Sequence, residues 1–539
     1  DKNLLYKGYT IQPYSPKAGT GLSSHELNQP GTYQDVTDTT ITAQFETIKK
    51  TLPTALQAEE ELYILAWTTT PWTLPSNTAL TIGGKIKYVV VETYNQYTHF
   101  PIRVLLAQAL VAKQFSGKYI SVETSKDLKT YAAGDKKIPY CITNEIIGKD
   151  LVGIRYKQLW KDAPLPLKNA EDAFRVILGN FVTTEDGTGI VHTAPTFGAD
   201  DAQAAKEASP PIPPLLVQDE YGNEEPLVTL QGKFHPVLGE LGGKYVKNEY
   251  YPAGTAPERS VDVEIAIRLK EENRAFKVEK YVHSYPNCWR TDKPILYYPL
   301  NSWFVKVSSE RDRMVTLNQQ INWKPKSTGE GRFGNWLANA NDWNLSRSRF
   351  WGIPLPIWRT EDGQETILIG SMEKLIQEIL KAIKAGLMKE NPFANFEVGN
   401  MSEDNYDLID LHKNTVDKIT LCSPSGKAMT READLIDVWF DSGSMPYAQW
   451  HYPFENKEKI DQNKAFPADY IAEGVDQTRG WFYTLHAIGT LVFDSVVYKN
   501  VVSNGLVLDK NGQKMSKRLG NATDPFETLS TYGADATRW

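Results

Sequence analysis

A chain of 539 residues is too long for a single hydrophobic core, and its length predicts about three or four domains. Hydrophobic residues make up 41% and charged residues 23%, a balance typical of globular proteins, and no repeated or biased tract indicates a solenoid or disorder. The formal net charge of -7 excludes the simplest kind of basic nucleic-acid clamp, so any contact with RNA must use local basic patches.

The sequence lacks the marks of a membrane protein or of a secreted disulfide framework. No stretch reaches the roughly 18 apolar residues that cross a bilayer, and the first residues lack a signal-peptide core. Cys141, Cys288 and Cys422 lie far apart, which argues against a disulfide framework and fits a reducing compartment. We therefore expect a cytoplasmic protein.

The first half of the chain is turn-rich and then β-rich. Residues 1–45 read as extended segments from the middle of a domain, so we expect sequence missing on the N-terminal side. From about residue 61 to 180, apolar stretches alternate with Gly, Asn and Pro turns, which is typical of short strands. A helix is predicted near 199–208, and the β-rich unit is predicted to continue to about residue 250.

The second half predicts helices and then a nucleotide-binding sheet. Residues 258–274 have helical spacing, and we place the end of the β-rich unit just after them, near residue 282. Another amphipathic helix is predicted over about 371–385. From residue 434 onward, strand-like and helix-like segments alternate in the βαβ manner, which predicts half of a nucleotide-binding α/β sheet.

A basic loop, Lys514-Met515-Ser516-Lys517-Arg518, stands near the C-terminal end of the chain. Lysines in such a loop are suited to neutralising the charge that develops on a triphosphate during adenylate formation. The alternative for an isolated motif of this kind is an ordinary solvated loop. Three upstream segments favour the first interpretation: Asp437-Val438-Trp439-Phe440-Asp441-Ser442-Gly443, Glu473-Gly474-Val475-Asp476-Gln477-Thr478-Arg479-Gly480-Trp481 and Ser503-Asn504-Gly505.

The order and separation of these segments resemble the second half of the catalytic fold of class I aminoacyl-tRNA synthetases. The resemblance implies an α/β fold, with a Rossmann-like catalytic half and an inserted β-rich editing domain, the CP1 domain. It implies ATP with Mg²⁺ as a substrate and Lys514, Ser516 and Lys517 as catalytic residues. The implied binding residues for ATP and the aminoacyl-adenylate are Glu473, Gly474, Asp476, Gln477, Trp439, Trp481, Asn504, Gly505, Met515 and Lys517. For each tryptophan, core packing is the alternative to walling the amino-acid side chain.

A second constellation lies in the β-rich part. It consists of the hydroxyl-rich peptide Thr68-Thr69-Thr70-Pro71-Trp72 and of residues 187–201. The alternative for the first peptide is an edge-strand turn that uses the β propensity of threonine. Together the peptides resemble the editing pocket of the isoleucine branch, since the valine and leucine enzymes carry an arginine and an acid around this proline. The implied editing residues are Thr68, Thr69, Thr70, Asn77, His192 and Asp201.

An editing pocket has a physical reason in this branch. A hydrophobic pocket distinguishes isoleucine from valine by one methylene, worth roughly 1–3 kcal/mol, so binding alone leaves many errors. The resemblance implies that Asp201 binds the α-ammonium of a misplaced valyl group and that the threonines position the ester and a water. His192 is expected either to shape the pocket or to contact the terminal adenosine, and not to act as a general base. For Asn77, an ordinary turn residue is the alternative to polar support of the pocket. Phe197 stands where many members have histidine, which puts proton transfer there in doubt.

The resemblance also implies an order of domains. A connection from the catalytic core over residues 1–45 precedes an editing domain over 46–282. The second half of the catalytic domain follows over 283–539, with a connective insertion at about 360–430. The H-x-G-H signature of the family is absent from these residues, so we expect the chain alone to be incompetent for aminoacylation.

The expected partners are tRNA(Ile), isoleucine and ATP, with no membrane, for a protein that is expected to be a monomer. No zinc is predicted, because Cys422 lacks the second thiolate of a C-x-x-C pair and tetrahedral zinc needs four ligands. The alternatives are a valyl- or leucyl-tRNA synthetase, or a stand-alone editing or RNA-binding protein that uses the nucleotide fold as a scaffold.

Overall fold

The structure, a computed structural model, describes residues 2–27, 31–219, 222, 224–512, 515 and 520–538. The chain folds into two compact units, Thr10–Leu300 and the combination of Asp1–Tyr9 with Asn301–Trp539. It passes from one unit to the other within the strands β1 (Leu5–Ser15) and β16 (Leu296–Val305). No helix in the described part of the chain is long and apolar enough to cross a membrane.

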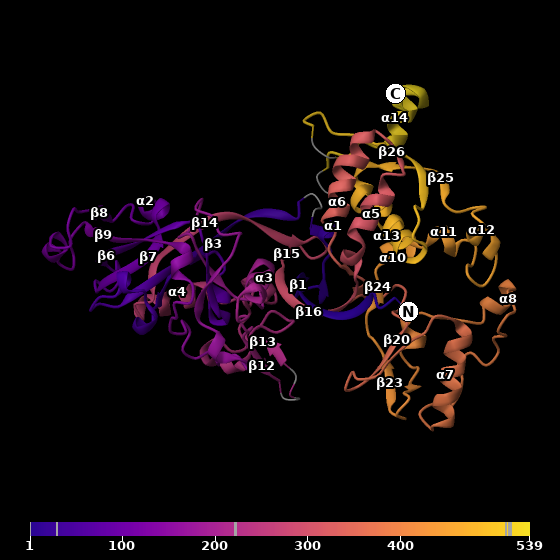
Figure 1. The fold of residues 1–539 in the computed structure, drawn as a ribbon, viewed down its shortest axis with the longest axis horizontal. Coiled ribbons are helices and arrows are strands. Elements are labelled where there is room, and N and C mark those ends of the chain that lie inside the picture. Colours follow the sequence, from indigo (N-terminus) through magenta and orange to yellow (C-terminus); the bar gives the residue numbers. More distant parts are fainter. Residues whose placement is uncertain are drawn as a thin grey trace. The chain divides into compact units, whose positions relative to one another are not determined.

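The unit Thr10–Leu300 is built on one large mixed sheet (Figure 1). The main path of the sheet has the order β10-β5-β11-β4-β7-β6-β9-β8, and β3 joins β4 to β14. The strands are β3 (Tyr33–Glu46), β4 (Leu62–Thr68), β5 (Ala79–Ile82), β6 (Lys87–Tyr94), β7 (Pro101–Ala107), β8 (Tyr119–Ser121), β9 (Ile138–Ile147), β10 (Arg175–Leu178), β11 (Ile190–Thr193), β14 (Ala275–Cys288) and β15 (Lys293–Pro294). The larger helices of the unit are α3 (Ala199–Glu207) and α4 (Val261–Glu271).

Strand β4 illustrates why this sequence forms a sheet with two covered faces. Ile64 and Ala66 belong to the core on one face, and Leu65 belongs to the core on the other. Because successive side chains of a strand point to opposite faces, a continuous apolar run predicts a strand that is buried on both sides. The β-rich interpretation of residues 61–180 and the helix near 199–208 are confirmed.

Both predicted junctions of the predicted editing domain fall inside strands. Position 45/46 lies at the end of β3 and position 282/283 lies in β14. The two strands pair antiparallel from Tyr33↔Pro286 to Ala43↔Ala275. The pairing joins segments that are far apart in sequence, and such pairing leaves no local signal at either end. The domain boundaries themselves stay predictions.

The other unit contains a three-stranded parallel sheet of order β17-β26-β25. The helix α13 connects β25 to β26, which confirms the βαβ pattern predicted after residue 434. Ten of the thirteen residues of α13 are buried, as expected for a helix that is apolar on all sides. The principal elements are α5 (Arg311–Asn318), β17 (Asn322–Lys324), α6 (Gly334–Ala338), α10 (Val438–Gly443), α11 (Met445–Ala448), α12 (Lys457–Asp461), β25 (Ala468–Gly474), α13 (Trp481–Phe493), β26 (Tyr498–Asn504), α14 (Pro525–Tyr532) and α15 (Ala534–Arg538).

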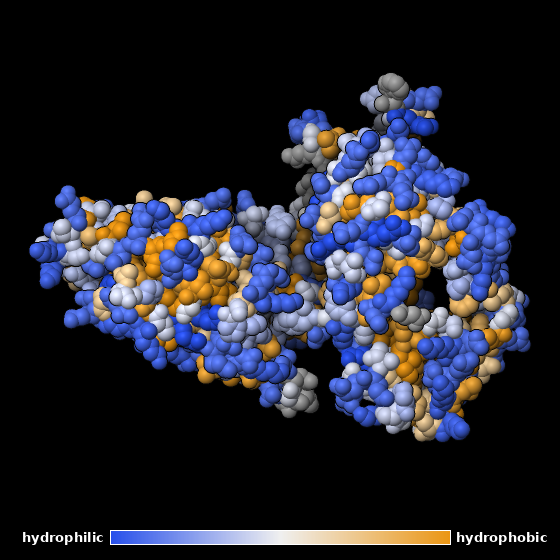
Figure 2. Space-filling model, viewed as in Figure 1, coloured by the Kyte–Doolittle hydropathy of each residue, from blue (hydrophilic) through white to orange (hydrophobic). Residues whose placement is uncertain are grey.

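A small four-stranded antiparallel sheet of order β21-β20-β23-β22 stands where the connective insertion was predicted. Its elements are β20 (Ile357–Thr360), β21 (Thr366–Leu368), α7 (Met372–Lys384), α8 (Glu403–Tyr406), α9 (Lys413–Val416), β22 (Leu421–Cys422) and β23 (Ala428–Arg431). The predicted amphipathic helix is α7, which begins after Ser371, whose Oγ accepts a hydrogen bond from the backbone N–H of Lys374 at 3.2 Å. Trp358, Ile379 and Met429 contribute to a separate core. Figure 2 shows apolar side chains exposed between hydrophilic ones on both units.

Candidate functional site

The hydroxyl-rich turn begins where β4 ends. Thr68 is the last residue of the strand, and its Oγ1 accepts a hydrogen bond from the backbone N–H of Thr70 at 3.0 Å. The two hydroxyl oxygens of Thr68 and Thr70 lie 3.2 Å apart. Pro71 then starts the short 3₁₀ helix η3 (Pro71–Ser76), because proline suits the first helical position. This threonine turn (residues 68–72) therefore presents two threonine hydroxyls side by side, with the half-buried Thr69 between them.

His192 on β11 joins this turn to the second predicted peptide. Its Nδ1 accepts a hydrogen bond from Nδ2 of Asn77 at 2.8 Å, so Nε2 carries the proton and donates to Oγ1 of Thr73 at 2.9 Å. The Thr73 hydroxyl donates in turn to the backbone carbonyl of Thr70 at 2.8 Å. Oδ1 of Asn77 accepts from the hydroxyl of Tyr156 at 2.7 Å. This chain of hydrogen bonds fixes the backbone of Thr70.

Burial sets the charge of His192. It lowers the pKa of the imidazole to about 3, so the ring is neutral near pH 7. Both ring nitrogens are already used, one as an acceptor and one as a donor. The ring therefore has no free nitrogen with which to act as a general base.

Asp201 lies in the first turn of α3. Its Oδ2 accepts a hydrogen bond from the backbone N–H of Ala194 at 2.8 Å. Gly198 makes room for the carboxylate, since a Cβ at that position would lie 2.7 Å from Cγ of Asp201. Burial raises the pKa of Asp201 to about 7. A cation that binds beside this carboxylate would favour its charged form.

Aromatic packing also connects the two peptides. The rings of Trp72 and Phe197 meet edge to face with centroids 5.1 Å apart, and both residues are buried. Phe197 thus has a packing role at a position where proton transfer was in doubt. The structure brings together the threonine turn, Asn77, His192 and the peptide that carries Asp201.

Sequence reasoning did not single out Asp262, although this residue contacts the same turn. Its Oδ1 accepts a hydrogen bond from the backbone N–H of Trp72 at 2.9 Å. Asp262 is buried on α4 together with Ile265, Ala266 and Leu269. The available signal was an acidic residue on the apolar face of a helix, at i, i+3, i+4 and i+7 spacing.

The predicted adenylate residues gather at the carboxyl ends of β25 and β26. In the parallel pairing of these strands, Glu473 lies beside Ser503 and Gly474 lies beside Asn504. Ligands of open α/β sheets bind at this edge. A Cβ on Gly474 would lie 2.5 Å from Oδ1 of Asp476, so glycine permits the close approach of that carboxylate.

Trp439, Gln477 and Trp481 lie close together beside that edge. Oε1 of Gln477 accepts from the backbone N–H of Trp481 at 2.9 Å, and Nε1 of Trp481 donates to the carbonyl of Ser442 at 2.9 Å. A Cβ on Gly480 would lie 2.5 Å from Oε1 of Gln477 and 3.4 Å from the ring of Trp439. These contacts hold both tryptophans at the junction of α10 and α13.

Asp437, which was not a predicted site residue, holds the start of α10. Its Oδ1 accepts from the backbone N–H of Trp439 at 3.3 Å. Its Oδ2 accepts from Nε1 of Trp343 at 2.9 Å and from Nη2 of Arg347 at 2.8 Å. A buried carboxylate with these partners fixes the position of Trp439 through the helix end.

The predicted catalytic residues Lys514, Ser516 and Lys517 lie outside the described residues. Met515 is half-buried and Gly505 is exposed. Asn521 and Asp509 flank the loop on its two sides, and Nδ2 of Asn521 donates to Oδ2 of Asp509 at 2.9 Å. This bond connects the two ends of the loop.

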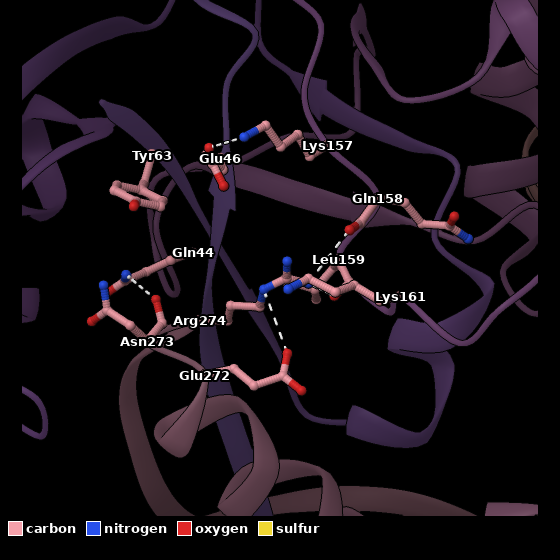
Figure 3. A pocket seen from close by; sticks show the side chains of 10 residues that line it. All are labelled: Gln44, Glu46, Tyr63, Lys157, Gln158, Leu159, Lys161, Glu272, Asn273 and Arg274. Atoms are coloured by element: carbon pink, nitrogen blue, oxygen red, sulfur yellow. Dashed lines mark hydrogen bonds and ion pairs between the residues drawn. The ribbon is translucent and has the colours of Figure 1, made fainter. Parts of the chain in front are cut away.

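A polar pocket of about 140 Å³ in the unit Thr10–Leu300 contains none of the predicted site residues (Figure 3). Lys157 pairs with Glu46, and Nε of Arg274 lies 3.6 Å from Glu272. Nε2 of Gln44 donates to a backbone carbonyl of the wall at 2.9 Å. The charged groups of the pocket largely pair with one another, so the pocket does not indicate a binding site.

The described residues include no group of three or more His, Cys, Asp or Glu side chains that could hold a metal ion. Cys141 and Cys288 are buried free thiols, and Cys422 is a partly exposed one.

The chain is similar to known proteins along its whole length. The family described as tRNA synthetases class I (I, L, M and V) matches residues 1–539. The chain is 58% identical to the isoleucine–tRNA ligase of Bacteroides fragilis, 59% identical to that of Cytophaga hutchinsonii and 43% identical to that of Treponema denticola, in each case over 100% of its own length. It covers 48%, 46% and 44% of these proteins, so it spans about half the length of the curated relatives it matches.

Proposed function

Because the chain belongs to the class I tRNA synthetases of the I, L, M and V group, we propose that it takes part in joining isoleucine to tRNA(Ile) and in hydrolysing valyl-tRNA(Ile). Identity of 58% to an isoleucine–tRNA ligase supports the choice of isoleucine within the family. ATP with Mg²⁺ is a substrate of the proposed reaction. We also propose that the protein is cytoplasmic and monomeric.

The observation that carries the hydrolytic part of the proposal is the bonded assembly of the threonine turn with the Asp201 peptide. The carboxylate of Asp201 binds the α-ammonium of the valyl group by a charge-assisted hydrogen bond. The hydroxyls of Thr68 and Thr70 orient the ester and the attacking water, with Thr69 beside them. His192 and Asn77 keep the turn in place.

The synthetic part rests on the edge of the parallel sheet. Trp439 and Trp481 wall the isoleucine side chain, and Gly474 and Gly505 leave room for the bound adenylate. The groups that hold the amino group and the ribose are the oxygen and amide groups of Glu473, Asp476, Gln477 and Asn504. Lys514 and Lys517, with Ser516 and Met515 in the same loop, would neutralise the pyrophosphate that leaves.

The test is hydrolysis of valyl-tRNA(Ile) by the chain, with isoleucyl-tRNA(Ile) as the matched substrate. We expect release of valine well above the spontaneous rate and little release of isoleucine, because the pocket admits the smaller side chain. Equal hydrolysis of the two esters, or none of either, would contradict the proposed editing activity.

A further inference from the structure

A buried cluster of charged groups lies behind the threonine turn and has no role in the reaction described above. Asp262 and Lys247 are 4% and 7% exposed. Nζ of Lys247 lies 3.1 Å from Oδ2 of Asp38 and 3.8 Å from Oδ2 of Asp262. The same ammonium lies 5.0 Å from the ring centre of Tyr285, and Nε2 of His283 lies 3.1 Å from Asp38.

Asp262 satisfies a donor that the turn cannot satisfy itself. The first N–H groups of a helix have no partner inside the helix, and proline has no N–H to offer. In η3 the first free donor is therefore the N–H of Trp72, and the preceding Thr70 makes no side-chain capping bond. Oδ1 of Asp262 accepts from this N–H at 2.9 Å, and thus caps the turn from a different helix.

Lys247 keeps that carboxylate charged. Burial raises the pKa of Asp262 to about 6, and the nearby ammonium of Lys247 opposes this rise. Burial also opposes the charge on Lys247, but Asp262, Tyr285 and Asp38 raise its pKa overall. A buried carboxylate with a paired cation is a stronger acceptor than a neutral group.

The cluster also connects the turn to the frame of the sheet. Asp38 lies on β3, and His283 and Tyr285 lie on β14, which pairs with it. His192 holds the middle of η3 through Thr73, so Asp262 provides a second and separate attachment at the beginning of η3.

We propose that Asp262, anchored by Lys247, is a positioning residue for hydrolytic editing: it fixes the N–H of Trp72 and thereby the Thr68–Thr70 peptide. The proposal rests on the proposed editing function of this pocket. Asp262 does not touch the substrate, so it acts on the orientation of the threonine hydroxyls and not on the binding of the ester. The rate of the bound complex, and not its affinity, depends on it.

The test compares Asp262→Ala, which removes the acceptor, with Asp262→Asn, which keeps an oxygen that can accept from Trp72. We expect the alanine variant to lower kcat for valyl-tRNA(Ile) hydrolysis on the order of 100-fold, since a small misplacement of reacting groups has effects of this size. KM should stay unchanged, and the asparagine variant should remain within about 5-fold of the wild-type kcat, because it retains the hydrogen bond. Glu264→Ala, which removes another carboxylate of α4, is the matched control and should leave kcat unchanged.

Equal activity of the alanine variant and the wild type would overturn the inference, as would equal losses in the alanine and asparagine variants or a change in KM alone. If Asp262→Ala does not fold, the Lys247→Met variant provides the test. A fall in kcat of about 10-fold in this variant would support the inference, and a kcat equal to that of the wild type would overturn it. A wild-type chain without deacylase activity would instead contradict the proposed function itself.

Discussion

The two candidate sites differ in how many of their polar side chains are bonded to neighbouring residues. Beside the threonine turn, Asn77 and His192 are buried, and each is bonded to neighbours on other elements. At the edge of the parallel sheet, Asn504 is exposed and Glu473 is half-buried, and neither side chain makes a hydrogen bond to another residue of the described part of the chain. Buried polar groups must be paired, whereas exposed ones are satisfied by water until a ligand replaces it. The difference leads us to expect that the proposed editing pocket is ordered before a substrate arrives, and that the proposed adenylate site has side chains available to bind a ligand.

The largest expected effect comes from Asp201, the group that we propose binds the substrate in the editing pocket. Asp201→Ala should lower kcat/KM for valyl-tRNA(Ile) hydrolysis by about 100-fold, because a charge-assisted hydrogen bond to the ammonium is lost. Asp200→Ala, which removes an exposed neighbouring carboxylate, is the matched control and should have little effect. A deacylation rate for Asp201→Ala close to that of the wild type would show that the ammonium binds elsewhere.

Replacement of His192 should destabilise the same part of the structure. His192→Ala removes one hydrogen-bond partner from the hydroxyl of Thr73 and one from the amide of Asn77. The free energy of unfolding should therefore fall by about 2–3 kcal/mol. Urea unfolding followed by hydrogen exchange of β11 would measure this loss. The exposed His412, changed to alanine, provides the comparison and should cost little. A stability equal to the wild type would mean that the hydrogen-bond chain does not hold the turn.

At the predicted adenylate site, the packing between α10 and α13 should be sensitive to added side-chain volume. A Cβ on Gly443 would lie 3.2 Å from the backbone carbon of Thr484 and 2.9 Å from Cδ1 of Ile488. Overpacking of this kind costs about 1–3 kcal/mol, which exceeds the gain of up to about 1 kcal/mol from alanine in a helix. Gly443→Ala should therefore lower the stability of this unit by about 1 kcal/mol. Gly370→Ala, with no atom within 4 Å of the added Cβ, should not.

The contrast also explains which residues could be predicted from the sequence. The strand β4, the threonine turn and the helix α3 follow from local patterns, and the family resemblance adds His192 and Asp201. Tyr156, Asp262 and Lys247 come from segments far away along the chain. Tyr156 bonds to Asn77, Asp262 bonds to the N–H of Trp72, and Lys247 lies beside Asp262. These contacts result from tertiary packing, such as that of α4 against η3, β3 and β14, and such packing leaves no motif at any one position.

The smallest expected effect concerns the charge of Asp201. Its pKa is raised to about 7 in the folded chain, so the folded state binds a proton more tightly than the unfolded state. The stability due to this proton is fully present below about pH 4 and is lost as the pH rises through about 7. Asp201→Asn does not titrate and keeps an oxygen for the N–H of Ala194.

The asparagine variant should therefore match the wild type at pH 4 and exceed it at pH 8 by up to about 1 kcal/mol, a value reduced for the partial exposure of the side chain. Denaturant unfolding at the two pH values measures the difference, and other titrating groups cancel because they are common to both chains. The same variant should have lost deacylation at pH 8, since it cannot hold the ammonium by charge. A variant that is less stable than the wild type at pH 8 would mean that the carboxylate is paired before the substrate binds, and the pocket would then be less ready for an ammonium than its geometry indicates.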